Sequence, residues 1–163
     1  MDKKKVCIIA AVLVCVALAF AMTGCSNDED MYVDEADITV DYLCGDYADQ
    51  LMADGADTTL GTVAVSEEDG DNVITVTEKE VVHNSDYENG YYIAETNAVY
   101  TFGVGGFAKF VYTDKSGELV FGNIEAFKKH NSKNADQLYT VYYMNDTVEL
   151  MLPVDPADVD ATR

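Results

Sequence analysis

Hydrophobic and polar residues follow two different periods along most of this chain. Between Val40 and Asp54, hydrophobic residues recur every three or four positions, which is the spacing of one face of an α-helix. The stripe consists of Val40, Leu43, Tyr47 and Leu51, widened by Cys44, Ala48 and Met52. Asp37 or Thr39 suits the N-cap position, and Gly55 suits the residue after the helix. We therefore predict a helix from Val40 to about Asp54 that packs against another element.

After this helix, β-branched and aromatic residues alternate with polar ones, as in half-buried strands. The predicted strands are 60–65, 73–77 with an extension through Val82, 91–94, 98–102, 107–112, 118–121, 138–144 and 147–154. Glu68-Asp69-Gly70-Asp71 has the Asp-Gly signature of a hairpin turn. Gly103-Val104-Gly105-Gly106 interrupts the pattern as a bend or bulge. A short helix is predicted from Ile124 to about His130, capped by Asn123.

These elements predict an α+β fold. It would contain a mainly antiparallel sheet of about six to eight strands, one longer N-terminal helix and one short helix. The alternative is an all-β barrel or sandwich that carries one helix.

The N-terminus has the three parts of a secretory signal. Lys3, Lys4 and Lys5 form a positive start, residues 6–22 carry no charge, and small uncharged residues precede Cys25. The uncharged run is shorter than the roughly 20 residues that a membrane-spanning helix needs, although such a helix remains an alternative. Ordinary signal cleavage after Ala21 is a second alternative, because Ala19-Phe20-Ala21 has the A-x-A form.

Met22-Thr23-Gly24-Cys25 resembles the lipobox of bacterial lipoprotein precursors. The resemblance implies cleavage between Gly24 and Cys25, with acyl chains of the palmitate type attached through the Cys25 thiol. Met22 departs from the leucine that is usual at its position. The resemblance covers residues 1–25 only, and it implies a protein held by lipid at the extracytoplasmic face of the cell membrane.

The expected organisation follows from this signal. Residues 1–24 are the signal peptide, and 25–34 are the lipidated cysteine and an acidic tether. Residues 35–154 are long enough for a single globular domain with one core, and 155–163 form an acidic C-terminal tail.

The charge of the chain limits its partners. The full sequence has a formal net charge of −20. The segment 1–24 contains Asp2 and three lysines, so the other 139 residues carry 29 acids against 7 bases, or −22. Nucleic acid is excluded as a partner because its phosphates need a basic surface. Solubility explains such a charge, while a cationic partner or divalent ions would be a more specific reason.

No catalytic, metal or cofactor motif stands out. Cys44 is the one cysteine left after Cys7, Cys15 and Cys25 are assigned to the signal and the lipid, and we predict that it is buried on the helix. His83 and His130 are 47 positions apart, too far for a spaced zinc motif. Residues 67–72 have oxygen ligands but lack the EF-hand spacing, so we predict no metal site; weak calcium binding by clustered carboxylates stays open.

Paired tyrosines are the only indication of a binding surface. Adjacent residues of a strand point to opposite faces, so one member of each pair would be exposed if only one face were covered. The candidate residues for interaction are Tyr91, Tyr92, Tyr142 and Tyr143. Exposed tyrosine is common where proteins recognise protein, peptide or sugar.

The sequence therefore favours a lipid-anchored, non-enzymatic binding or interaction domain of unspecified ligand. Two alternatives remain, a carboxylate-dependent hydrolase of the envelope and a structural envelope protein. A cleft with converging acids would favour the hydrolase, whereas an exposed aromatic patch would favour the interaction domain.

Overall fold

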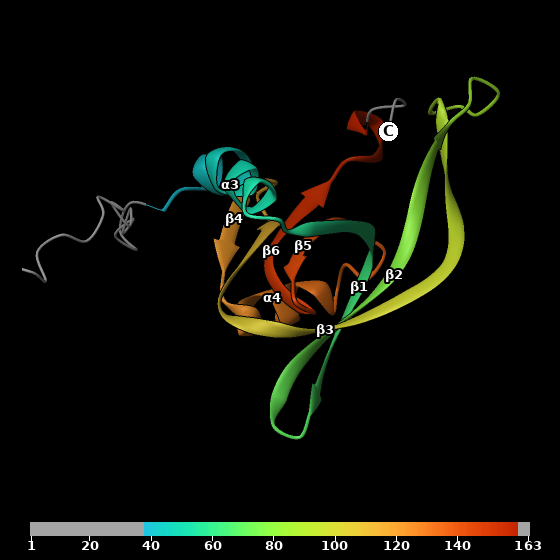
Figure 1. Ribbon diagram of the computed structural model, residues 1–163. Coiled ribbons are helices and arrows are strands. Elements are labelled where there is room, and N and C mark those ends of the chain that lie inside the picture. The colour runs from blue at the N-terminus through green and yellow to red at the C-terminus, as the bar shows by residue number, and fades with distance from the viewer. Residues whose placement is uncertain (1–37, 160–163) are drawn as a thin grey trace, which may run out of the picture. The chain divides into compact units, whose positions relative to one another are not determined.

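The computed structural model describes residues 38–159, so the predicted signal segment and the predicted lipidation and cleavage residues, Gly24 and Cys25, lie outside the described residues (Figure 1). Helical segments are α2 (Val40–Tyr42), η2 (Leu43–Tyr47), α3 (Ala48–Ala53), α4 (Ile124–Asn131) and η3 (Pro156–Asp158). Strands are β1 (Asp57–Glu68), β2 (Asp71–His83), β3 (Tyr91–Thr113), β4 (Leu119–Gly122), β5 (Leu138–Met144) and β6 (Thr147–Val154). Within residues 38–159, no helix has both the length and the apolar character needed to cross a membrane.

The six strands form one mixed sheet in the order β2-β1-β5-β6-β3-β4. All neighbours run antiparallel except β3 and β6, which are parallel. An additional antiparallel pairing of β2 with β3 joins the two ends of the five-strand run, and β4 continues the sheet from β3. The sheet therefore closes into a barrel of β1, β2, β3, β6 and β5.

The class predicted from the sequence, α+β with a mainly antiparallel sheet and two helical regions, is confirmed. The closure into a barrel is the feature that the alternative prediction had named. Four of the barrel strands lie in the order β5-β1-β2-β3, which is a Greek key. Helix α4 follows β4 and contacts β1 and β3 (Figure 1).

One strand is much longer than the sequence pattern indicated. Three separate strands were expected between Tyr91 and Tyr112, but β3 is a single strand of 23 residues. It bends where its pairing shifts register, once around Asn97, which has φ of 63°, and once between Val104 and Lys109. The predicted bulge in the glycine-rich stretch is present, but it bends the strand without ending it.

The N-terminal helix contains a π turn that changes which residues share a face. Thr39 caps its start, since its Oγ1 accepts a hydrogen bond from the Tyr42 amide at 3.1 Å. In η2 the hydrogen bonds close after five residues, so Leu43 and Ala48 lie on one face and both are buried. The prediction that Cys44 is buried is wrong, because this turn leaves its side chain exposed.

The core consists of two hydrophobic clusters that meet across the barrel wall. The inner one contains Ile74, Val76, Phe110, Phe127 and Tyr139, with other barrel residues. The outer one joins the N-terminal helix to the sheet through Leu43, Ala48, Leu51, Ala56, Val111 and Leu150. The helix thus covers the outside of the β5-β6-β3 part of the wall, and both faces of that part are packed.

The described part of the C-terminal segment, which the sequence predicted as an acidic tail, contains regular structure. Asp155 caps the 3-10 helix η3, with its Oδ1 accepting a hydrogen bond from the Ala157 amide at 2.9 Å. Val159, the last described residue, accepts a hydrogen bond from a side chain of β2. Residues 155–159 therefore lie against the barrel.

Candidate binding sites

The seam between β1 and β2 opens at one end of the barrel. The two strands pair from Glu68 and Asp71 as far as Gly61 and Glu78. Beyond this point, residues 57–60 of β1 pair only with β5, and residues 79–83 of β2 pair only with β3. Each strand therefore keeps one partner and presents its other edge toward the opening.

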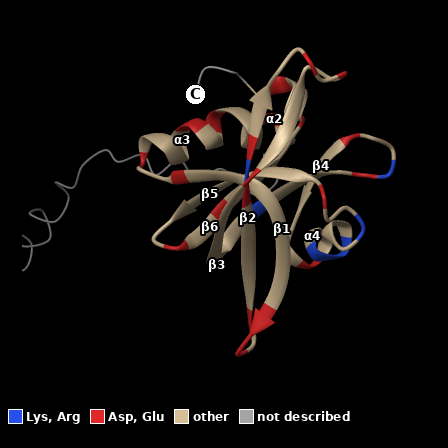
Figure 2. Cartoon of the chain, turned by 90° about the vertical axis from the view of Figure 1, so that its right-hand side faces the viewer, with Lys and Arg blue, Asp and Glu red and all other residues tan. Residues whose placement is uncertain are grey.

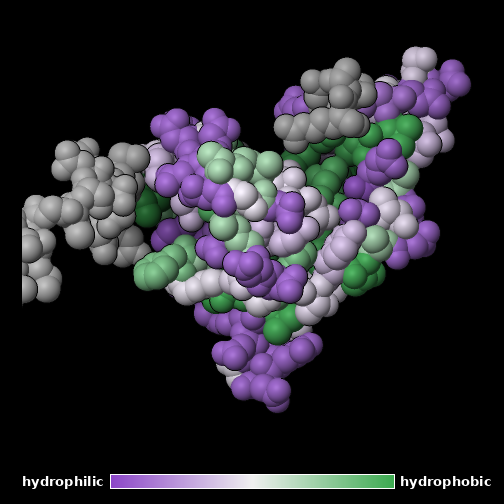
Figure 3. Space-filling model, in the orientation of Figure 1, coloured by the Kyte–Doolittle hydropathy of each residue, from purple (hydrophilic) through white to green (hydrophobic). Residues whose placement is uncertain are grey.

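Both open edges line a single cavity. It has a volume of about 490 Å³. Its lining residues are Thr58, Thr59, Leu60, Lys79, Glu80, Val81, Val82, His83, Thr140, Val154 and Val159. Figure 3 shows the hollow with hydrophobic residues along its walls. We call this cavity the seam groove.

Gly61 marks the closed end of the seam groove. A Cβ atom at this position would lie 2.8 Å from Val76 Cγ1 and closer still to the carbonyl oxygen of Thr77. Glycine therefore allows β1 and β2 to approach closely at their last paired position, immediately before they separate.

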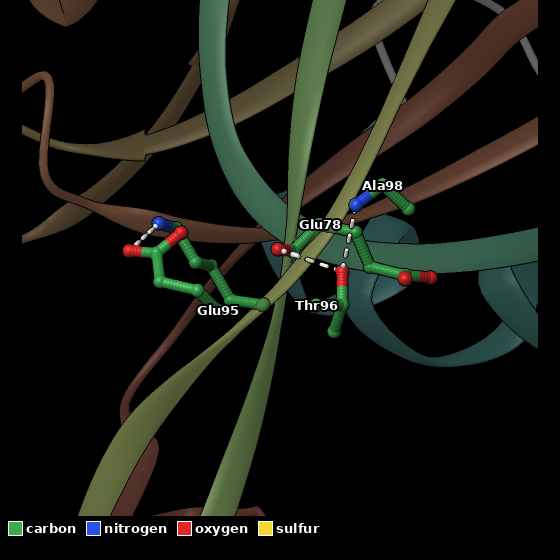
Figure 4. Close-up of polar contacts among 5 residues, drawn as sticks. Glu78, Glu95, Thr96 and Ala98 are labelled. Atoms are coloured by element: carbon green, nitrogen blue, oxygen red, sulfur yellow. Dashed lines mark hydrogen bonds and ion pairs between the residues drawn. The ribbon is translucent and has the colours of Figure 1, made fainter.

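On the other side of β2, the bend of β3 is held by polar contacts (Figure 4). Lys79, whose side chain is mostly buried, forms an ion pair with Glu95. Thr96 Oγ1 donates to the carbonyl oxygen of Glu78 at 3.2 Å and accepts from the Ala98 amide at 3.2 Å. These contacts attach the outer part of the β2-β3 hairpin, residues 79–95, to the bend from which it extends.

The C-terminal segment contacts the same groove. His83 Nε2 lies 2.6 Å from the carbonyl oxygen of Val159. Because a carbonyl only accepts, Nε2 carries the hydrogen of this bond. The contact places Val159 at the His83 side of the seam groove. It involves β2 and does not involve the edge of β1.

The four tyrosines named from the sequence lie in two places. Tyr91 and Tyr92 are on the β2-β3 hairpin, where Tyr92 is exposed and its ring lies 4.9 Å from that of Tyr87. Tyr143 packs on Phe102 at a ring separation of 4.4 Å, and Tyr142 packs in the cluster under the N-terminal helix. Tyr142 and Tyr143 are both half-buried because both faces of β5 are covered.

The sequence pattern missed the most exposed aromatic side chain of the described residues. Phe107 is 84% exposed, and it directly follows the glycine-rich bend of β3. Val99 and Ile93, also on β3, are exposed as well. The signal that could have identified Phe107 is its position after Gly105 and Gly106, where a strand that bends turns a side chain outward.

A second cavity, of about 580 Å³, lies between α4 and the turn that joins β3 to β4. The end of β3 contributes Tyr112 and Thr113, and the turn contributes Asp114 and Lys115. The helix and its C-terminal extension contribute Ala126, Lys129, His130, Lys133 and Asn134. The rings of Tyr112 and His130 lie 4.7 Å apart. Figure 2 shows cationic residues on α4, whereas acidic residues are spread over the other elements. We call this cavity the lysine cavity.

The titratable groups of the lysine cavity differ in their environment. Hydrogen bonds to Asp114 lower the pKa of its carboxyl group, chiefly the bond from the Ser116 hydroxyl at 2.6 Å. Burial lowers the pKa of His130. Asp114 is therefore a carboxylate at neutral pH, and His130 is mainly uncharged there.

The described residues bring together no group of three or more metal-ligating side chains. Burial raises the pKa of the Glu149 carboxyl, which is the shift expected of a general acid, but Glu149 lines neither of the two cavities. Cys44 is exposed, and burial of part of its side chain together with the nearby Asp41 raises the pKa of its thiol. A raised thiol pKa disfavours the nucleophilic thiolate.

Comparisons with known proteins find no family model, no curated protein and no solved structure that matches this chain.

Proposed function

We propose that this chain is a lipoprotein, held by lipid on Cys25 at the extracytoplasmic face of the membrane, whose domain binds an extended peptide in the seam groove. One observation carries the binding part of the proposal. Two strand edges, residues 58–60 and residues 79–83, line the same cavity and have no strand partner on that side among the described residues.

An unpaired strand edge presents amide and carbonyl groups that an incoming strand can satisfy. The seam groove offers two such edges, so a peptide of about four or five residues could pair on both sides, as an inner strand of a sheet does. Leu60, Val81 and Val82 would contact its side chains. Backbone pairing would supply affinity, and these side chains would supply selectivity.

Charge favours a basic or neutral peptide. The one lysine of the groove, Lys79, is paired with Glu95, whereas Glu80 also lines the groove and forms no ion pair within residues 38–159. The chain as a whole carries −20. An acidic peptide or a nucleic acid would meet repulsion here, so the proposal excludes both classes of ligand.

A binding role is favoured over the hydrolase that the sequence left open. A carboxylate-dependent hydrolase needs two acids that converge on one cleft, one with a raised pKa. The seam groove contains Glu80 as its one acidic lining residue, and Glu149, the one described carboxyl with a raised pKa, lies outside it. The alternative of a purely structural envelope protein predicts no ligand in the groove.

Hydrogen exchange of the full chain in detergent tests the groove. The probe is the peptide (Lys-Val)₄, which is basic and alternates as a strand does. The matched control replaces each valine by proline, which cannot donate a backbone hydrogen bond. We expect (Lys-Val)₄ to slow the exchange of alternate amides in 57–60 and 79–83, and the proline peptide to leave them unchanged. Equal protection by both peptides, or protection only elsewhere, would contradict peptide pairing in the groove.

A separate experiment tests the anchor. Replacing Cys25 by serine removes the thiol that the lipobox resemblance assigns to lipid attachment, so labelling with a fatty acid should be lost and the precursor should stay uncleaved. Cys44→Ser is the control, because it removes a thiol without affecting the lipobox, and it should be labelled and cleaved normally. Normal labelling and membrane retention of Cys25→Ser would refute the lipoprotein assignment.

A further inference from the structure

The few cations of this acidic protein are concentrated in one place. Residues 38–159 contain six lysines, Lys79, Lys109, Lys115, Lys128, Lys129 and Lys133. Three of them, Lys115, Lys129 and Lys133, line the lysine cavity. In the part of the chain that the structure describes, none of these three ammonium groups forms an ion pair.

The helix dipole explains only part of this arrangement. Lys128 and Lys129 lie in the last turn of α4, where positive charge stabilises a helix. Lys133 lies beyond the end of α4, and Lys115 comes from the turn between β3 and β4 on the opposite wall. The dipole does not account for Lys115, which faces the same cavity as Lys129 and Lys133.

The one acidic residue that lines the cavity, Asp114, is hydrogen-bonded within its own turn. The Asp114 carboxylate accepts hydrogen bonds from the Ser116 amide at 2.7 Å, the Ser116 hydroxyl at 2.6 Å and the Glu118 amide at 3.1 Å. It therefore serves to hold the turn that carries Lys115. Three lysines against one carboxylate leave the cavity with a net positive charge inside a protein of net charge −20.

We infer that the lysine cavity binds the phosphate group of a small ligand, independently of the seam groove. Lysine binds phosphate as a point charge, and several converging ammonium groups suit a compact anion with a high charge. The paired rings of Tyr112 and His130 provide an apolar wall for the carrier of the phosphate. A long polyanion would be repelled, because Glu118, Glu125 and Asp136 lie on the elements around the cavity.

Calorimetric titration of the full chain in detergent tests this site with inorganic phosphate and glycerol 3-phosphate, at constant ionic strength. We expect saturable binding of both, and weaker binding of acetate. The double variant Lys129→Ala/Lys133→Ala should lose about tenfold in affinity or more, since it removes two charge-assisted contacts. Lys128→Ala is the control, because it removes one lysine charge from the last turn of α4 outside the cavity, and its affinity should change less than about twofold.

Three outcomes would overturn the inference. They are the absence of saturable binding, acetate binding as tightly as phosphate, and an equal loss of affinity in Lys128→Ala and the double variant. An equal loss in both variants would show that phosphate responds to the overall positive charge of α4 and not to a defined site. Circular dichroism of each variant confirms that it is folded before its affinity is compared.

A second arm distinguishes a soluble ligand from a lipid headgroup. The chain is reconstituted into phosphatidylcholine vesicles with and without phosphatidylglycerol, and the titration with glycerol 3-phosphate is repeated. Unchanged affinity supports a soluble phosphate ester. Weaker affinity with phosphatidylglycerol, with no such effect in the double variant, supports a headgroup that already occupies the cavity.

Discussion

Asn131 donates a buried hydrogen bond from Nδ2 to the carbonyl oxygen of Val63, at 2.7 Å and across 68 positions of sequence. Asn131 is the last residue of α4, and Val63 lies in the middle of β1. The bond attaches the helix to the barrel, and the same helix carries one wall of the lysine cavity.

We expect Asn131→Ala to destabilise the domain by about 1–3 kcal/mol, because it leaves a buried carbonyl oxygen without its donor. Chemical denaturation measures the change. Asn134→Ala is the control, since Asn134 is exposed and its side chain bonds only to His130 in the same segment. Similar losses of stability in both variants would show that the bond from Asn131 to Val63 contributes no more to stability than an exposed bond.

Gly61→Ala should destabilise the domain by about 1–3 kcal/mol, since the new Cβ would overlap the backbone of β2 at the closed end of the seam groove. Gly106→Ala adds the same methyl group where nothing lies within 4 Å, so its effect should stay within about 0.5 kcal/mol. Thermal unfolding compares the two. A stable Gly61→Ala protein would show that β1 and β2 can separate further without cost.

Leu51→Ala should cost about 2–5 kcal/mol, because Leu51 is 6% exposed in the cluster under the N-terminal helix. The neighbouring Met52 is 49% exposed, so Met52→Ala should change stability by less than about 0.5 kcal/mol. Denaturation of both variants tests which face of the helix is packed. A loss below about 0.5 kcal/mol for Leu51→Ala would indicate that this face is free.

Tyr139 predicts how stability depends on alkaline pH. Its side chain is fully buried, its hydroxyl has no hydrogen-bond partner among the described residues, and burial raises its pKa from 10.0 to about 12. Between these two values the unfolded chain releases the Tyr139 proton while the folded chain retains it. The free energy of unfolding should therefore fall as pH rises above 10.

Tyr139→Phe removes both the titrating group and the unpartnered hydroxyl. We expect this variant to be at least as stable as the parent at pH 7, and to lose less stability between pH 10 and 12. Part of the alkaline loss should remain, because burial also raises the pKa of Tyr47 and Tyr143. Denaturation curves at several pH values measure the slope. An unchanged slope in Tyr139→Phe would exclude Tyr139 as its source.

Local features of the fold were predictable because their causes lie within a few residues. Thr39 and Asn123 cap the two helices as expected, since a cap depends on a side chain and an amide three residues away. The Asp69-Gly70 turn was also predicted, and the predicted strands 138–144 and 147–154 left only Asn145 and Asp146 to connect them. All four residues have positive φ, the conformation that glycine adopts freely and that Asn and Asp tolerate better than most residues.

Long-range pairing decided the features that the sequence pattern could not provide. The three strands predicted between Tyr91 and Tyr112 became one, because β2, β6 and β4 pair along successive parts of β3 and hold it extended through its bends. The exposure of Cys44 depends on a single π turn, which the helical pattern of Val40 to Asp54 does not reveal.

The same distinction applies to the candidate sites. The sequence alone determined the lipobox resemblance, the acidic charge and the periods of the helix and strands, because these are properties of neighbouring residues. Only the tertiary structure brought Lys115 to the cavity that Lys129 and Lys133 line, and only strand pairing opened the seam between Leu60 and Val82. These contacts join residues far apart in the chain, so they depend on how the barrel closes and no local pattern encodes them.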